Sequence, residues 1–210
     1  MKVLIDIGRG RGAESETILL CALMLGASNH AKTEREQNDF YATEPRAVEK
    51  LLLALREDNI NLAEKLWEPA CGEGHISEVL LAAGYSVRSS DLVDRGYGEA
   101  FDFLEQTEDW SGDIITNPPF KLSLPFIQKS LELIPDGNKV LIFQRLNFLE
   151  SGKRYRFFKD NPFKYIYVHA SRVGTAMNAD FERFHAKSMA YAWYIWEKGY
   201  QGESMMRWIP

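Results

Sequence analysis

The chain has 210 residues, enough for one α/β domain with a proper core. With 45% hydrophobic and 26% charged residues, it has the composition of a soluble globular protein. The net charge of -5 argues against a generally basic nucleic-acid binder. The two cysteines provide no disulfide framework or zinc-ligand pattern, and this cysteine usage predicts a cytoplasmic location.

Residues 1–38 are predicted to be an N-terminal extension and linker. Their apolar run at 18–27 is too short to cross a bilayer, which takes about 20 residues. The segment before the run carries acidic residues, whereas a secretory signal begins with a short basic region. We therefore expect no membrane association, and we expect the run to form a small helix that packs on the domain.

From residue 39 to residue 210 the hydrophobic pattern predicts a single domain of alternating helices and strands, large enough to be a catalytic domain. Its first helix is expected at 44–57, with Thr43 as N-cap and Pro45 in the first turn. Further elements follow in order: strands at 65–69, 86–90, 113–116, 139–144, 165–169 and 190–197, and helices at 74–83, 122–134 and 155–160. The alternation predicts an α/β fold with a mostly parallel sheet and helices on both faces. Ligands of such sheets bind beyond the carboxyl ends of the strands.

The turn after the strand at 65–69 has the features of a ligand loop. Two glycines, Gly72 and Gly74, permit a tight turn and let a ligand lie against bare peptide. A third glycine and a basic residue for a diphosphate are missing, and the carboxylates Glu68 and Glu73 suit a cationic ligand instead. By itself, such a turn is also compatible with a purely structural role.

Two more carboxylates follow predicted strands. Asp91 could accept hydrogen bonds from both hydroxyls of a ribose. Asp102 could accept a hydrogen bond from an adenine amino group, and Phe103 could stack on the adenine ring. Each alone is compatible with a solvated loop, but together they describe a pocket for an adenosine that carries a positive charge nearby.

The strongest motif is Asn117-Pro118-Pro119-Phe120, directly after the strand at 113–116. Two prolines fix the backbone and remove two N–H donors, which leaves carbonyls free to face a site. The Asn117 side-chain oxygen and the Pro118 carbonyl could accept both hydrogens of a planar amino group and make its nitrogen a better nucleophile. Phe120 could stack on the ring that carries the amine. A rigid structural turn is the alternative.

The charges are unevenly distributed along the chain. Residues 1–116 carry 11 Lys and Arg against 22 Asp and Glu, whereas residues 117–187 carry 12 against 6. A polyanion could therefore approach the face that begins at the Asn117 motif, although folding could also scatter these charges into a mixed surface. The candidates for phosphate contacts are Arg145, Lys153, Arg154, Arg156 and Arg172.

At these residues the chain resembles the adenine-specific DNA methyltransferases of the class I fold, especially the small prophage-type members. The segment 68–74 resembles their cofactor loop, the Asn117 tetrapeptide their catalytic motif, and residues 39–45 the segment over the methionine end of the cofactor. The resemblance implies a Rossmann-like class I fold with a seven-stranded sheet, S-adenosylmethionine as cofactor, and methylation of adenine N6 in DNA. It implies the following cofactor contacts: Tyr41, Thr43, Glu68, Pro69, Ala70, Cys71, Gly72, Gly74, Asp91, Asp102, Phe103 and Asn117. The implied chemistry is direct in-line transfer without a metal.

Three alternatives remain open at this point. The first is an N-methyltransferase for RNA, acting on guanine or adenine amines, and the second is one for a protein glutamine amide, because an Asn-Pro-Pro-aromatic motif serves those amines as well. The third is a non-catalytic binding module, against which the intact tetrapeptide argues. No separate target-recognition domain is visible after Phe120. Target choice would then depend on a specificity partner or a homodimer, or the specificity would be loose.

Overall fold

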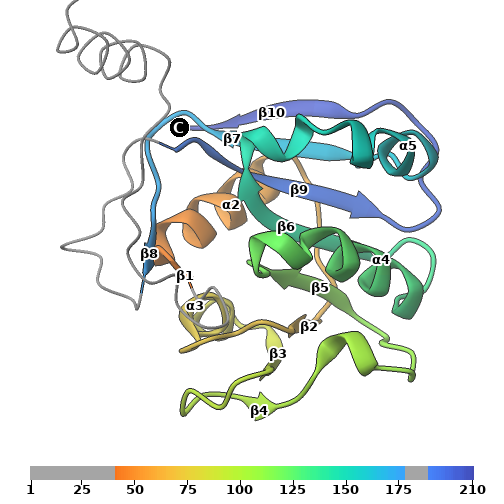
Figure 1. The fold of residues 1–210 in the computed structure, drawn as a ribbon. Coiled ribbons are helices and arrows are strands. Elements are labelled where there is room, and N and C mark those ends of the chain that lie inside the picture. The colour runs from red at the N-terminus through yellow and green to blue at the C-terminus, as the bar shows by residue number, and fades with distance from the viewer. Residues whose placement is uncertain (1–40, 178–188) are drawn as a thin grey trace, which may run out of the picture. The chain divides into compact units, whose positions relative to one another are not determined.

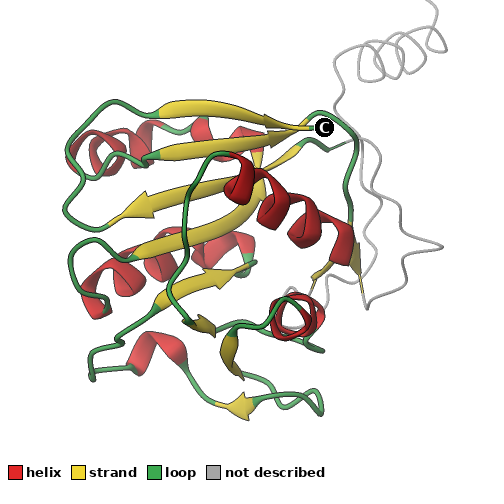
Figure 2. Ribbon diagram, turned by 180° about the vertical axis from the view of Figure 1, so that it is seen from behind, coloured by secondary structure: helices red, strands yellow, loops and turns green. Residues whose placement is uncertain are grey.

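The computed structural model describes residues 41–177 and 189–210. These residues form an eight-stranded sheet with helices on both faces and a separate two-stranded sheet (Figures 1 and 2). The extension and linker expected at 1–38, with its small helix, lie outside the described residues. Within the described ranges, no helix combines the length and the apolar character that a membrane crossing requires.

The large sheet has the strand order β10-β7-β9-β6-β5-β2-β3-β4. Strand β9 is antiparallel to both of its neighbours, and all other pairs are parallel. The strands have these bounds: β2 Lys65–Glu68, β3 Ser86–Asp91, β4 Glu99–Ala100, β5 Asp113–Thr116, β6 Lys139–Arg145, β7 Tyr165–His169, β9 Tyr191–Glu197 and β10 Met205–Ile209. The expected mostly parallel α/β architecture is confirmed.

The sheet has one strand more than the seven expected. Strand β10 pairs in parallel with β7 and forms the outer edge of the sheet. Three of its five side chains are exposed, so it carries no buried run that a hydrophobic pattern could detect. At the opposite edge, β4 has only two residues, both exposed.

The helices divide between the two faces of the sheet. Helices α2 (Pro45–Glu57) and α3 (His75–Ala82) cover one face, and α4 (Ser123–Leu133) and α5 (Gly152–Asp160) cover the other. Figure 1 is seen from the α4 side and Figure 2 from the α2 side. Short 3-10 turns lie at Phe103–Glu105 (η1), Phe120–Leu122 (η2) and Leu146–Leu149 (η3).

Strand β9 contributes buried side chains to both faces of the sheet. Its alternate residues Tyr191, Trp193 and Ile195 pack under α2 and α3. The other alternate residues, Ala192, Tyr194 and Trp196, pack under α4 and α5. Because successive side chains of a strand point to opposite faces, an almost continuous aromatic run fills both cores.

The expected N-cap of the first helix was wrong. Glu44 is the N-cap residue of α2 and makes no side-chain capping bond. Thr43 instead ends strand β1 (Tyr41–Thr43), which pairs antiparallel with β8 (Thr175–Met177) in the small sheet. The Thr43 hydroxyl is therefore directed to another partner, which lies at the end of β5.

Candidate active site

The turn between β2 and α3 takes the form expected of a ligand loop. Gly72 and Gly74 have φ values of 55° and 87°, which non-glycine residues rarely adopt. The Gly74 N–H donates to the Cys71 carbonyl at 2.8 Å and closes the turn. Pro69 and Cys71 are buried beside it, and burial raises the pKa of the Cys71 thiol to about 12, so this thiol stays protonated.

Glu68 lies beneath this turn and is 1% exposed. Its Oε2 atom accepts hydrogen bonds from the Ser77 backbone N–H, at 2.8 Å, and from the Ser77 hydroxyl, which ties β2 to the first turn of α3. Burial raises the pKa of Glu68 to about 8; the bonds from Ser77 lower it, and the Asp91 carboxylate raises it further. A positive charge brought near Glu68 would favour its ionised form.

Asp91 connects the ends of two strands. It closes β3, and its Oδ2 accepts from the Gly72 N–H at 2.9 Å while its Oδ1 accepts from the Val93 N–H at 3.0 Å. A carboxylate has about four acceptor positions, so both oxygens keep the capacity to accept a hydroxyl. The structure therefore brings Asp91 and the glycine turn together, as the sequence predicts.

Tyr97 is a residue of this region that the sequence patterns did not reveal. Its ring lies so close to Gly74 that an added Cβ at Gly74 would be 2.5 Å from the ring. The backbone carbonyl of Tyr97 accepts a weak bond from the Cys71 thiol at 3.6 Å. The flanking Gly96 and Gly98 have φ values of 81° and 72°, and this pair of glycines is the local signal that could have drawn attention to the loop.

Asp102 and Phe103 occupy different environments. The Asp102 side chain accepts from the Leu104 N–H at 3.0 Å and caps η1. Phe103 is 1% exposed, and its ring contacts Trp67 edge-on and Phe126, with both ring centroids at 5.1 Å. In this structure the Phe103 ring is therefore part of the core under α4 rather than a surface on which adenine could stack.

Asn117 is held by strand β1. Its Nδ2 donates to the Tyr41 carbonyl at 2.9 Å and to the Thr43 hydroxyl at 3.0 Å. Its Oδ1 is buried and accepts no hydrogen bond within the described residues. A carbonyl oxygen can only accept, so the bond to Tyr41 fixes which end of the amide faces β1.

Of the two prolines after Asn117, only Pro118 leaves its carbonyl free of partners among the described residues, as the motif predicts. Pro118 is buried, and its carbonyl accepts no hydrogen bond within the described part of the chain. The carbonyl of Pro119, by contrast, accepts from the Leu122 N–H at 2.8 Å and starts η2. Within residues 41–177 and 189–210, the motif therefore presents two acceptors without partners, the Asn117 side-chain oxygen and the Pro118 carbonyl.

Phe120 completes this group with a half-buried aromatic ring. The Tyr41 ring stacks on it, with centroids 5.5 Å apart and planes 30° apart. The Arg145 guanidinium carbon lies over the Phe120 ring, 4.2 Å from its centroid. A planar acceptor group that stacked on Phe120 would therefore meet Arg145 as a neighbour.

The five basic candidates separate in space. Arg145 lies at the Asn117 motif, and Arg172 lies in the segment after β7. On α5, Lys153 is exposed and Arg156 is 93% exposed beside Asp160. Arg154 donates to the Phe148 carbonyl at 2.8 Å and covers the Phe148 ring, so it also has a packing role.

Comparison with known proteins places the fold. No protein-family model matches the chain, and no curated protein matches it. A solved structure of a putative RNA methyltransferase from Pyrococcus horikoshii has a TM-score of 0.54 at 15% identity, over 85% of this chain and 98% of the other. A putative class I S-adenosylmethionine-dependent methyltransferase from Listeria monocytogenes has a TM-score of 0.54 at 15% identity, over 93% and 72% of the two chains.

A third similar structure is the methyltransferase subunit of a type I restriction-modification system from Streptococcus thermophilus, with a TM-score of 0.55 at 14% identity over 94% of this chain and 53% of the other. Together with the strand order, these similarities establish the fold. The chain has the Rossmann-like fold of the class I S-adenosylmethionine-dependent methyltransferases, as the sequence predicted.

Proposed function

We propose that this protein is an S-adenosylmethionine-dependent N-methyltransferase that acts on the N6 amino group of adenine in DNA. The observation that carries the proposal is the orientation of Asn117. Both hydrogens of its amide are donated to acceptors on β1, and its oxygen is buried without a partner among the described residues. A buried acceptor left unpaired costs about 1–3 kcal/mol, and an incoming amino group would relieve that cost.

The second acceptor of the site is the Pro118 carbonyl. A planar amino group has two hydrogens, and Asn117 Oδ1 together with the Pro118 oxygen could accept both. Accepting both hydrogens draws the nitrogen lone pair out of conjugation with the ring, and it stabilises the positive charge that develops on nitrogen during attack. The work of the protein is then to position the amine and to stabilise that charge.

The turn at the end of β2 suits the cofactor. Gly72 and Gly74 provide bare peptide, and Asp91 places a carboxylate next to them where a ribose could be bound. When bound, S-adenosylmethionine supplies an electrophilic methyl group on a sulfonium. Asp91 is the acidic group that would favour a cationic ligand there, and Glu68 would add to it once the charge of the ligand favours its ionised form. Tyr97 is the ring that lies against the same turn.

The acceptor is proposed to be DNA because of the basic excess that begins at Asn117 and the resemblance of the motifs to adenine-specific DNA enzymes. A duplex adenine would have to be flipped out of the stack to reach Asn117. The similar structures include one described as a putative RNA methyltransferase and one described as a restriction-modification subunit, so RNA belongs in the same test. We place the catalytic domain at 39–210, and the alternatives for target choice are a specificity partner, a homodimer or loose specificity.

The deciding experiment is transfer of a labelled methyl group to duplex DNA, single-stranded DNA, RNA and protein, followed by nucleoside analysis. We expect N6-methyladenine in DNA. Label in guanine, in RNA alone or in protein would contradict the proposed acceptor. Failure to bind S-adenosylmethionine in calorimetry would contradict the enzyme assignment as a whole.

A further inference from the structure

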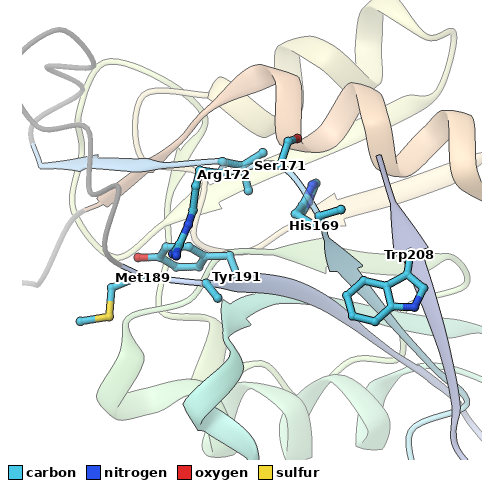
Figure 3. Close-up of a pocket in the computed structure, with 9 residues that line it drawn as sticks. His169, Ser171, Arg172, Met189, Tyr191 and Trp208 are labelled. Carbon is cyan, nitrogen blue, oxygen red and sulfur yellow. The ribbon is translucent and has the colours of Figure 1, made fainter. Parts of the chain in front are cut away.

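A cavity of about 200 Å³ lies at the end of β7 and is lined by nine residues that include His169, Arg172, Tyr191 and Trp208 (Figure 3). It is built from the end of β7, the start of β9 and the outer strand β10. The position is the carboxyl edge of the sheet, where the Asn117 motif also lies. The sequence names only Arg172 of the lining, as a candidate for phosphate contact, and the proposed chemistry assigns no role to the cavity itself.

His169 is the feature that points to a ligand. Its side chain is 7% exposed, and neither ring nitrogen has a hydrogen-bond partner within the described residues. Buried polar groups in folded proteins nearly always have partners. Burial, with Lys50 and Arg46 nearby, lowers the pKa of His169 to about 4, so the neutral ring offers one N–H donor and one acceptor.

The surroundings of the cavity are cationic. The Lys50 ammonium donates to the Ser171 hydroxyl at 3.0 Å and also to the Pro210 backbone oxygen, which partly offsets its charge. The Arg46 guanidinium donates to the Arg172 carbonyl at 3.1 Å. Glu44 forms an ion pair with Arg46 at 3.0 Å and offsets one charge. The exposed Arg172 side chain forms no ion pair or side-chain hydrogen bond with any described residue. An anionic group therefore fits this cavity better than a cationic or neutral one.

Arg145 connects the cavity to the Asn117 motif. Tyr191 lines the cavity, and its hydroxyl accepts from Arg145 Nε at 3.4 Å. The same Arg145 guanidinium lies over Phe120. On the outer side, Trp208 is 64% exposed and presents an aromatic ring on the cavity wall. Cations beside an exposed aromatic ring are the arrangement that binds a nucleic-acid strand through phosphate and base.

We propose that this cavity binds a nucleotide that neighbours the methylated one, with His169 and Arg172 at its phosphate and Trp208 against its base. The inference rests on the proposed function, because it takes the acceptor to be a nucleic acid. DNA and RNA offer the same phosphate chemistry, so the test contains both.

The test measures anisotropy of short fluorescein-labelled, adenine-containing oligonucleotides, as DNA and as RNA, with the full chain and S-adenosylmethionine present. Arg172→Ala and Trp208→Ala change exposed side chains, so both variants should fold. We expect each to weaken binding roughly 5- to 100-fold, and Trp208→Phe to retain most of the affinity. Arg172→Ala should also reduce the slope of log affinity against log salt by about one.

The matched control is Arg56→Ala. Arg56 is exposed near the far end of α2, about 15 Å along the helix from Arg46. If Arg172→Ala and Trp208→Ala bind like Arg56→Ala while the wild type methylates nucleic acid, the cavity has no such role and the proposed function stands. If the wild type binds the cofactor but methylates no nucleic acid, the proposed acceptor and this inference both fail.

Discussion

The amide of Asn117 donates to the hydroxyl of Thr43, 3.0 Å away and 74 residues earlier in the chain. Together with the bond to the Tyr41 carbonyl, this contact determines the direction of Asn117 Oδ1. Thr43 is therefore a positioning residue for the proposed reaction, in addition to any contact it makes with the cofactor. Its role suggests a test that separates orientation from binding.

Replacement of Thr43 by Val should lower kcat. The change keeps the side-chain shape but leaves one Asn117 N–H without an acceptor, at a cost of about 1–3 kcal/mol. We expect kcat to fall roughly 5- to 100-fold, with Thr43→Ser restoring most of it. Single-turnover methyl transfer at saturating cofactor measures the effect. Equal rates for the Val and Ser variants would show that this bond does not orient the site.

Replacement of Asn117 itself should have a larger effect. Asn117→Ala removes the acceptor oxygen, and we expect a loss of at least about 100-fold in kcat. The cofactor dissociation constant, measured by calorimetry, should change much less than kcat, although Asn117 is also an implied cofactor contact. Asn61→Ala, at an exposed loop position after α2, is the matched control. An Asn117→Ala enzyme with normal turnover would be incompatible with the proposed mechanism.

Phe120 should act on the acceptor rather than on the cofactor. Phe120→Leu retains apolar volume but removes the flat ring that contacts Tyr41 and Arg145. Stacking of a base on an aromatic ring is worth about 1–3 kcal/mol, so KM for nucleic acid should rise roughly 10-fold. Phe120→Tyr should behave like the wild type. A rise in the cofactor dissociation constant instead would place Phe120 in the cofactor site.

Gly74 provides a test of the ligand loop with an internal control. Gly74→Ala combines an unfavourable φ of 87° with a Cβ 2.5 Å from the Tyr97 ring, whereas Gly84→Ala has a similar φ of 94° and open space. The φ alone costs about 1–2 kcal/mol. Urea denaturation should therefore show a larger loss of unfolding free energy for Gly74→Ala than for Gly84→Ala. Adding Tyr97→Ala should remove the excess; no excess would mean that the ring moves aside freely.

Glu68 should make stability depend on pH. Its pKa is raised by burial from 4.5 to about 8, so the folded state binds the proton more tightly than the unfolded state does. Unfolding free energy should therefore fall as pH rises from about 4.5 to about 8, and it should change little on this account outside that window. Glu68→Gln should flatten the profile, whereas Glu73→Gln, at an exposed neighbour, should not. Parallel profiles for the wild type and Glu68→Gln would contradict the assigned pKa shift.

The sequence predicts the central fold well because its strands are buried and its turns are marked. Strands β5 and β7 have the predicted bounds, and the other predicted elements differ by one to three residues at their ends. Strand β10 was missed because its side chains are largely exposed. Strands β1 and β8 have three residues each and pair across more than 130 residues, so no local pattern could reveal them.

The sequence indicated some residues of the candidate site and could not indicate others. Gly72, Gly74, Asp91 and Asn117 were predictable because glycines, carboxylates and a Pro-Pro turn follow strands directly. Phe103 could not be assigned from the sequence, because an aromatic residue after a carboxylate suits a core as well as a binding surface. The ring of Tyr97 over Gly74 and the unpaired ring of His169 depend on tertiary packing, which residue spacing does not report.

The small sheet of β1 and β8 has a consequence for the order of assembly during synthesis. A nascent chain that extends through β5 already contains the glycine turn, Asp91 and Asn117, but β1 still lacks its partner, which lies at residues 175–177. The hydrogen bonds that orient Asn117 come from β1. The acceptor geometry is therefore completed only when the late part of the chain returns to the early part, so a chain arrested before β8 should have the cofactor turn in place and an unaligned amide.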